Sequence, residues 1–143
     1  MPPRCVSFLV GFIYRPPGST IRTDREIVSN IENVLCLTTD VYVLGDVNMD
    51  LMKGTNYTLY NDLILLGLDQ LISEITRPES KSCIDLVYSN NRTNVLTSSV
   101  VAIGLSDHCP VTVVRKHNGS FAKRKVHKTV QYRDLKHFNE HIF

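Results

Sequence analysis

Apolar residues recur along this chain with two different spacings, and the changes of spacing mark the expected secondary structure. Apolar residues three and four positions apart predict helices that begin at Thr23 and Tyr57 and end near Leu35 and Leu66. Strands and helices alternate in the first half of the chain, so the expected fold class is α/β. Short runs rich in Val, Ile, Leu and Tyr predict strands at residues 5–14, 41–46, 68–72, 82–88, 95–103 and 111–114.

Two local signals set the expected ends and pairings of these elements. Thr23 and Glu26 have the spacing of a capping box, which predicts that the first helix begins at Thr23. Asn90-Asn91 is a turn signal, so the strand over 95–103 is expected to pair back on the strand over 82–88 as a hairpin. Both are short-range signals, and tertiary packing overrides such signals where the two conflict.

Length and composition indicate one folded domain. A chain of 143 residues with 43% hydrophobic and 21% charged residues is long enough to bury a core. The apolar stretch over 6–14 is too short to span a bilayer, and it lacks the cleavage site of a signal peptide. The four cysteines form no C-x-x-C pair, so we expect reduced thiols without a metal. The chain is therefore predicted to be intracellular and not secreted.

Charge is divided unevenly along the chain. Residues 1–115 carry 9 Lys/Arg against 12 Asp/Glu, whereas residues 116–143 carry 7 against 2. This division predicts a mildly acidic domain over 1–115 followed by a basic linker over 116–143, with a short amphipathic segment over 132–143. A basic segment suits a polyanion partner such as nucleic acid, and a solvated linker has the same composition.

The strand over 41–46 leads into Gly45-Asp46-Val47-Asn48, which is the first candidate for chemistry. Open α/β sheets place functional residues at the carboxyl ends of their strands. While the chain stays extended, Asp46 and Asn48 point the same way and can face one small site. There the carboxylate can bind a metal or take a proton from water, and the amide can orient that water. The same residues also make a good turn after a strand, so a purely structural interpretation stays open.

Other polar residues lie at strand ends or within apolar runs. Tyr14 ends the first strand, Asp85 lies in the middle of an apolar run, and Asp107 precedes His108 in the loop before the last strand. Plainer interpretations are that the tyrosine caps the core and that Asp85 faces solvent at a sheet edge. A carboxylate buried in such a run otherwise needs a cation or a histidine as partner. His108 is the only histidine before the basic linker, and imidazole beside carboxylates suits acid–base work.

Together these residues form a set suited to metal-assisted phosphodiester hydrolysis. In such chemistry a carboxylate activates water, an imidazole stabilises the phosphate oxygens, and a metal neutralises developing charge. Hard oxygen ligands favour Mg²⁺ or Mn²⁺ over zinc. The set comprises Tyr14, Asp46, Asn48, Asp85, Asp107 and His108.

Four motifs in this order resemble the endonuclease/exonuclease/phosphatase superfamily. More narrowly, the chain is similar to the C-terminal portion of the apurinic-type endonuclease domain of non-LTR (LINE-like) retrotransposons, and residues 132–139 resemble the linker toward the reverse transcriptase. The motifs are Tyr14-Arg15-Pro16-Pro17, Gly45-Asp46-Val47-Asn48, Ser82-Cys83-Ile84-Asp85-Leu86 and Ser106-Asp107-His108-Cys109-Pro110-Val111.

The resemblance implies a role for each matched residue. Asp46 matches the catalytic aspartate that activates the attacking water, and Asn48 the residue that positions this water and contacts phosphate. His108 matches the histidine that contacts the scissile phosphate, and Asp85 the aspartate that orients this histidine. Remaining matches are Asp107 to the acidic residue adjoining the metal, Tyr14 to the phosphate-contacting tyrosine, and Thr76 or Ser82 to auxiliary substrate contacts.

The resemblance also implies that this chain matches only part of the family's site. In the family an earlier portion supplies an Asn and a Glu, the Glu being the principal metal ligand, and no residue before Tyr14 matches them. The family fold is a sandwich of two sheets with outer helices. We therefore expect a partial α/β sandwich, about half of that fold, with one apolar sheet face partly uncovered. The expected function is that of a truncated DNA endonuclease with impaired activity.

The resemblance leaves partners and two other functions open. DNA is the expected partner, with the earlier portion of the domain or the reverse transcriptase region as a protein partner and no membrane. The nucleus is the compartment where such a protein meets DNA. One alternative is a phosphatase or phosphodiesterase of the same superfamily that acts on a substrate other than nucleic acid. The other is a non-catalytic relic that binds nucleic acid through phosphates alone, with binding that weakens steeply with salt.

Overall fold

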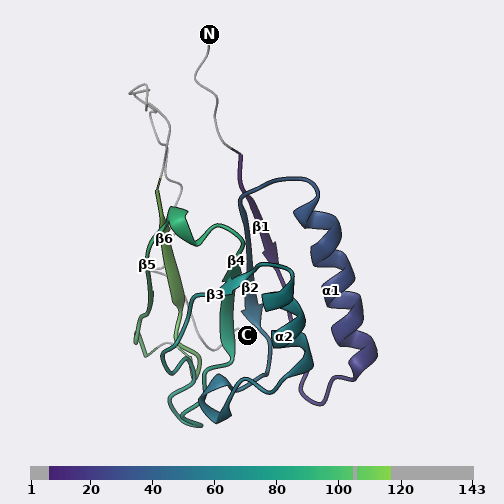
Figure 1. Ribbon diagram of the computed structural model, residues 1–143. Coiled ribbons are helices and arrows are strands. Elements are labelled where there is room, and N and C mark those ends of the chain that lie inside the picture. The colour runs from purple at the N-terminus through teal and green to yellow at the C-terminus, as the bar shows by residue number, and fades with distance from the viewer. Residues whose placement is uncertain (1–6, 105, 117–143) are drawn as a thin grey trace, which may run out of the picture.

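A computed structural model describes residues 7–104 and 106–116 of the protein, which form a mixed α/β fold with two sheets and two helices (Figure 1). The prediction of an α/β fold class is confirmed at this level. Short 3-10 helices span Leu51–Lys53 and Arg92–Asn94. The elements in chain order are β1 (Leu9–Phe12), α1 (Ile21–Leu35), β2 (Val41–Asp46), α2 (Thr58–Leu65), β3 (Asp69–Gln70), β4 (Asp85–Ser89), β5 (Val95–Val100) and β6 (Val111–Arg115).

The larger sheet has the strand order β1-β2-β4-β3. β1 and β2 are parallel neighbours, as expected for two strands joined by a helix, and β4 runs antiparallel to both β2 and β3. β5 and β6 form a separate antiparallel pair. The described residues therefore divide into one four-stranded and one two-stranded sheet.

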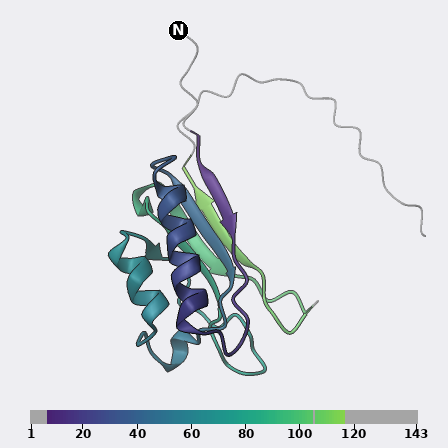
Figure 2. The same cartoon turned by 90° about the vertical axis from the view of Figure 1, so that its right-hand side faces the viewer.

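The four-stranded sheet lies between two layers. Helices α1 and α2 cover one face, and the β5–β6 pair lies against the other (Figure 2). Side chains alternate along each strand, so Val43 and Leu86 point to the helices while Leu44 and Val87 point to the β5–β6 pair. On the helix side the core is closed, and Leu59 of α2 is fully buried there.

Helix α1 begins earlier than the capping-box spacing predicts, and that prediction is wrong. The helix starts at Ile21 after Thr20, and Asp24 lies in its first turn. Asp24 accepts from Nε of Arg15 at 2.6 Å, which fixes the start of the helix beside the end of β1. A long-range ion pair thus outweighs the local signal at Thr23. The predicted apolar stripe is confirmed, since Ile31 is buried.

Two predictions about the second half of the chain are also wrong. β5 pairs with β6 and not with β4, because both edges of β4 are already occupied by β2 and β3. The short 3-10 helix Arg92–Asn94 carries the chain from β4 to the other layer. Asp85 is the first residue of β4 and does not lie in its middle.

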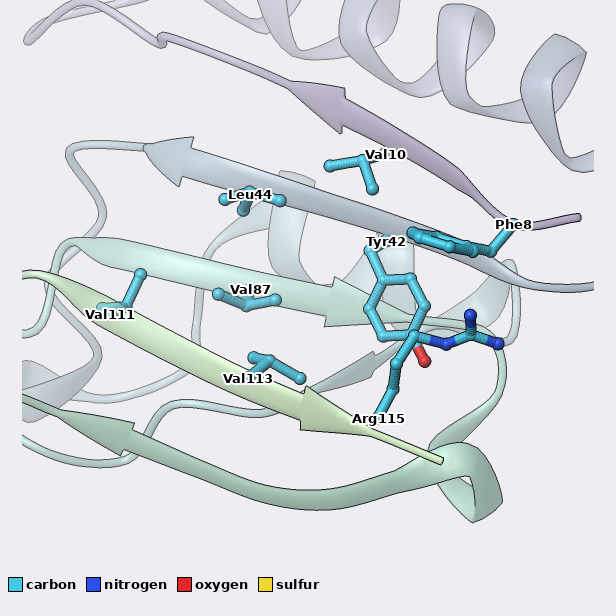
Figure 3. Close-up of a pocket in the computed structure, with 8 residues that line it drawn as sticks. All are labelled: Phe8, Val10, Tyr42, Leu44, Val87, Val111, Val113 and Arg115. Atoms are coloured by element: carbon cyan, nitrogen blue, oxygen red, sulfur yellow. The ribbon is translucent and has the colours of Figure 1, made fainter. Parts of the chain in front are cut away.

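The face of the larger sheet opposite the helices is only partly covered. A groove of about 190 Å³ lies between β1, β2, β4 and β6 (Figure 3). Beside it, alternate residues of the β1 segment remain open to solvent, with Phe12 77% and Tyr14 65% exposed. One apolar face of the larger sheet is therefore partly open. The groove is lined by Phe8, Val10, Tyr42, Leu44, Val87, Val111, Val113 and Arg115.

The basic linker expected over 116–143 lies outside the described residues apart from Lys116. The amphipathic segment expected over 132–143 lies wholly outside them. Within the described ranges, no helix is long and apolar enough to cross a membrane.

Candidate functional site

Two carboxylates face each other where β2 ends and β4 begins. Asp46 and Asp85 are directly paired across the antiparallel strands, so both side chains lie on the sheet face that carries the β5–β6 pair. Directly opposed residues have Cβ atoms about 4.5–5.5 Å apart, and like charges in such a pair destabilise the sheet. A cation or proton donor at this point would relieve that repulsion.

Glycine at position 45 makes this arrangement possible. Gly45 has φ +150°, and a Cβ there would lie 1.8 Å from the carbonyl oxygen of Ile13. The close approach of β1 to β2 therefore requires glycine, and it places the end of β1 beside Asp46. The Gly-Asp sequence thus has a packing reason as well as a chemical one.

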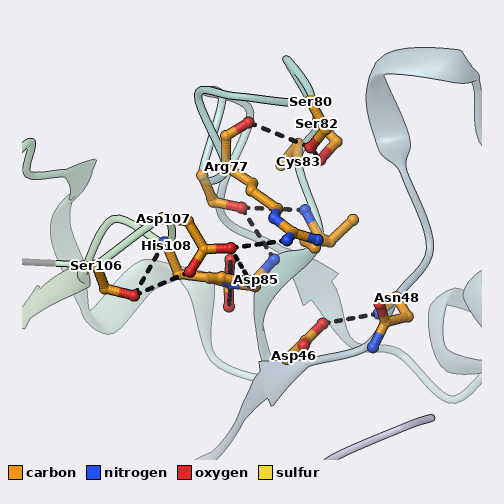
Figure 4. Close-up of polar contacts among 12 residues, drawn as sticks. Asp46, Asn48, Arg77, Ser80, Ser82, Cys83, Asp85, Ser106, Asp107 and His108 are labelled. Carbon is orange, nitrogen blue, oxygen red and sulfur yellow. Dashed lines mark hydrogen bonds and ion pairs between the residues drawn. The ribbon is translucent and has the colours of Figure 1, made fainter. Parts of the chain in front are cut away.

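His108 supplies a partner for one of the two carboxylates. Its Nδ1 lies 2.9 Å from Oδ2 and 3.1 Å from Oδ1 of Asp85, from a loop 23 residues further along the chain (Figure 4). The hydroxyl of Ser106 accepts from the backbone N–H of His108 at 3.2 Å, which fixes the loop. With Nδ1 engaged by Asp85, the ring presents Nε2 as its remaining nitrogen. The His108 side chain is 29% exposed, so a ligand can reach it.

Tyr14 lies beside Asp46 on the neighbouring strand. The N–H of Arg15 donates to the carbonyl of Asp46 at 2.9 Å, which continues the parallel pairing of β1 and β2 beyond Phe12. In that register Tyr14 stands next to Asp46 on the same face of the sheet. The structure therefore brings Tyr14, Asp46, Asp85 and His108 into one row across the sheet.

Asn48 turns away from the extended path that the sequence suggested. It has φ +51°, and its side-chain amide donates to the carbonyl of Arg15 at 2.9 Å. Its backbone N–H donates to Oδ1 of Asp46 at 3.1 Å. The turn interpretation is therefore correct for the backbone, and the turn also orients the Asp46 carboxylate.

Asp107 is held by an arginine. Oδ2 of Asp107 accepts from Nη2 of Arg77 at 2.7 Å, and Oδ1 accepts from Ser106 Oγ at 3.2 Å. The bond from Arg77 is the largest influence that lowers the pKa of Asp107 below its ordinary value, with Ser106 contributing in the same direction. Asp107 therefore remains a carboxylate in the neutral range, about 40% exposed beside His108.

Thr76 connects the start of β4 to the loop that carries His108, a role that sequence reasoning missed. Its Oγ1 accepts from the backbone N–H groups of Ile84 and Asp85, each at 3.1 Å, and its carbonyl accepts from Cys109 N–H at 2.7 Å. Thr76 is fully buried and Ser82 is 6% exposed, so neither side chain is open to a substrate in this structure. Thr76 instead joins the start of β4 to the loop that carries His108.

Asp50 joins the loop after β2 to β4. Its Oδ1 accepts from the backbone N–H of Met52 at 3.1 Å and of Cys83 at 3.0 Å. Burial acts to raise the pKa of Asp50, but bonds from Cys83, Met52 and Lys53 outweigh it and lower the pKa below its ordinary value. Burial, together with the charges of Asp50 and Asp85, raises the pKa of the Cys83 thiol to about 11. This thiol is therefore protonated and unreactive at neutral pH.

The donor atoms at this edge of the sheet suit a hard cation in part. Mg²⁺ is commonly held by one or two carboxylates together with waters and substrate phosphates, and Asp46 with Asp85 supplies two carboxylates. Among the described residues, no group of three His, Cys, Asp or Glu side chains is arranged to hold a metal ion. The chemistry of the two carboxylates fits Mg²⁺ or Mn²⁺ as part of a ligand set. Asp107, the residue that the resemblance places beside the metal, is instead bonded to Arg77.

Comparison with known proteins gives no match to this chain among family models, curated proteins or solved structures. What the arrangement can do chemically therefore follows from its own geometry. A carboxylate oriented by a turn can take a proton from water, and an imidazole oriented by a second carboxylate can donate to an anionic oxygen. These two groups lie in one row on the same face of the sheet.

Proposed function

We propose that this chain carries part of the active site of a metal-dependent DNA endonuclease of the endonuclease/exonuclease/phosphatase type, the class that nicks target DNA in retrotransposition. The observation that supports this best is the bond between Asp85 and Nδ1 of His108, placed directly across the strand pair from Asp46. An oriented imidazole and a separate carboxylate on one face can share the work of phosphodiester hydrolysis, and this row supplies both groups.

In this proposal each residue acts on water or phosphate. The Asp46 carboxylate accepts from the backbone N–H of Asn48, which orients it, and it takes a proton from the attacking water. Nε2 of His108 donates to an oxygen of the scissile phosphate, while Asp85 fixes the orientation of the ring. Tyr14, exposed beside Asp46, contacts a neighbouring phosphate oxygen through its hydroxyl.

Mg²⁺ or Mn²⁺ is the expected cation, and the negative charge of the opposed Asp46 and Asp85 carboxylates would attract it to this edge of the sheet. When bound, it neutralises charge that develops on the phosphate oxygens. A cation here also removes the repulsion between the two opposed carboxylates. Because the described residues offer two carboxylates and no group of three, further ligands come from substrate, water or another polypeptide segment.

The proposal includes a polypeptide partner, which packs on the partly open sheet face. The groove floor is apolar, with Leu44, Val87 and Val113 among its lining residues. Phe12 and Tyr14 stand exposed next to it and next to Asp46. A segment equivalent to the earlier portion of the family's domain, packed on this face, would lie close enough to complete the metal site.

Nicking of supercoiled plasmid tests the proposal, with Mg²⁺ against EDTA, on protein whose fold is checked by circular dichroism. We expect metal-dependent nicking that falls by a factor of about 10² to 10⁴ in Asp46→Asn and in His108→Ala, the range for loss of an acid or base. Asp69→Asn is the matched control, because Asp69 is an exposed carboxylate on β3 away from the row.

Each other outcome argues against the proposal in a different way. Nicking that persists in His108→Ala would mean that the row is not the active site. Activity on a phosphoinositide without activity on plasmid would favour the non-nucleic-acid phosphatase. DNA binding without nicking, if it weakens steeply with salt and survives Asp46→Asn, would favour a non-catalytic nucleic-acid-binding protein.

A further inference from the structure

Arg77 stands next to the candidate site on a rigid backbone. Its N–H donates to the carbonyl of Ser82 at 3.0 Å, and Ser82 N–H donates back to the Arg77 carbonyl at 3.2 Å. The preceding residue is the fully buried Thr76. The base of the Arg77 side chain is therefore fixed relative to the start of β4, and its guanidinium reaches the loop that carries His108 (Figure 4).

One carboxylate oxygen lies between Arg77 and the histidine. Oδ2 of Asp107 accepts from Nη2 of Arg77 at 2.7 Å and lies 4.0 Å from Nε2 of His108. Because Nδ1 of His108 is bonded to Asp85, Nε2 is the nitrogen that the proposed function assigns to phosphate. A movement of about 1 Å, the difference between 4.0 Å and an ordinary N–H···O bond, would let Asp107 occupy that nitrogen instead.

We infer that Arg77 is a positioning residue that holds Asp107 away from His108 and so keeps Nε2 free for a substrate phosphate. This inference rests on the proposed function for the identity of the phosphate, and on the geometry alone for the competition between Arg77 and His108. An arginine suits the task because its guanidinium is always charged and donates through a rigid planar group. It therefore holds the Asp107 carboxylate at 2.7 Å while the imidazole Nε2 stays at 4.0 Å.

The inference is tested without any need for catalysis by the rate at which diethyl pyrocarbonate modifies His108, measured by mass spectrometry on the full chain. Arg77→Ala frees Asp107 to bond Nε2, so we expect modification to slow about fivefold, which corresponds to about 1 kcal/mol of coupling between residues in contact. Asp107→Asn added to Arg77→Ala should restore the original rate. The modification rates of the four other histidines in the same sample serve as the internal reference.

Two further variants guard against simple loss of structure. Arg77→Lys keeps a cation within reach of Asp107 and should retain most of the original rate. Arg22→Ala removes an exposed arginine that pairs with Glu26 on α1, far along the chain from this loop, and should change nothing. An unchanged His108 rate in Arg77→Ala, or a slow rate that Asp107→Asn fails to restore, would overturn the inference.

Nicking kinetics separate this inference from the proposed function. If the protein nicks DNA, Arg77→Ala should lower the rate in the native background and have no further effect in an Asp107→Asn background. A protein that does not nick would count against the proposed function, while the modification rates would still decide the role of Arg77. Equal losses from Arg77→Ala in both backgrounds would show that Arg77 does not act through Asp107.

Discussion

The two ends of the β2–β4 strand pair each carry buried or half-buried carboxylates, but the charges are balanced differently. At the end where β2 begins, Asp40 is 1% exposed and is bonded by Arg115. Asn94 also donates to Asp40 at 3.3 Å, and Phe8 stacks on the Arg115 guanidinium at 4.2 Å. One buried carboxylate therefore meets one permanent cation, whose side chain is 20% exposed.

At the end where β2 finishes, two carboxylates face each other and only one of them is bonded to an imidazole. Asp46 faces Asp85 directly, and His108 is bonded to Asp85 alone. The Asp85 side chain is 16% exposed, against 1% for Asp40. The comparison indicates that a buried carboxylate matched by one permanent cation is structural, whereas two opposed carboxylates beside one imidazole, with access to solvent, leave negative charge for a ligand.

The largest expected effect is at the glycine that brings β1 against the candidate site. Gly45→Ala places a Cβ 1.8 Å from the Ile13 carbonyl oxygen, so we expect a loss of about 4 kcal/mol or more in the free energy of unfolding. Gly11→Ala is the control, because a Cβ at Gly11 meets nothing within 4 Å. Urea unfolding measures the stability of both variants. Equal stability would contradict the close approach of β1 to β2 at Gly45.

The second largest effect is expected from breaking the ion pair between Arg115 and Asp40, at the structural end where β2 begins. Arg115→Met leaves Asp40 buried without its cation and should cost about 3–5 kcal/mol of unfolding free energy. Arg22→Ala breaks an exposed pair in which the arginine is 86% accessible, and should cost no more than about 0.5 kcal/mol. Adding Asp40→Leu to Arg115→Met should recover part of the loss. If Arg115→Met were as mild as Arg22→Ala, the structural end would not depend on its ion pair.

At the candidate site, in the absence of metal, removal of a charged group is expected to stabilise the fold and not to destabilise it. Asp46→Asn removes one of two opposed charges and keeps an oxygen that can accept from Asn48, so unfolding free energy should rise by about 0.2–1 kcal/mol. Added Mg²⁺ should stabilise the native protein and not this variant. Chemical denaturation with and without Mg²⁺ checks both points, and destabilisation by Asp46→Asn would mean that this carboxylate is structural.

The smallest expected effect is a pH dependence from Asp50. Its pKa is lower in the folded protein than in the unfolded chain, so its charge stabilises the fold at neutral pH. That stabilisation is lost as the pH falls from about 5 to below the folded-state pKa. Asp50→Asn keeps an acceptor for Met52 and Cys83 but removes the charge, so its stability should fall less on acidification. An acid limb as steep as that of the native protein would show that Asp50 contributes nothing to it.

Local patterns predicted much of the fold because they depend on neighbours along the chain. The run Val41–Asp46 is a strand, and α2 spans Thr58–Leu65, within one residue of the predicted helix at each end. The capping box at Thr23 failed because the Arg15–Asp24 ion pair set the start of α1. The pairing of β5 failed because a turn signal says that the chain reverses, but not which edge is free.

The candidate residues were predicted from the sequence, and the resemblance predicted that Asp85 orients His108, two side chains that the structure brings together. Asp85 needed a partner by its sequence context, and the structure supplies His108. Thr76 was singled out only as a match to an auxiliary substrate contact, and nothing in the sequence indicated its structural role as a buried acceptor. Its two bonds to the start of β4 depend on how the loop folds back, which no local pattern specifies.

By itself, the sequence determined the helices, most of the strands and the chemical groups available, because periodicity and propensity act over a few residues. Tertiary structure decided which of those groups meet. Asp85 reaches a histidine 23 residues away, and Arg77 reaches Asp107 across 30 residues. Sheet register set Asp46 opposite Asp85, and register depends on packing of the whole domain and not on any one segment.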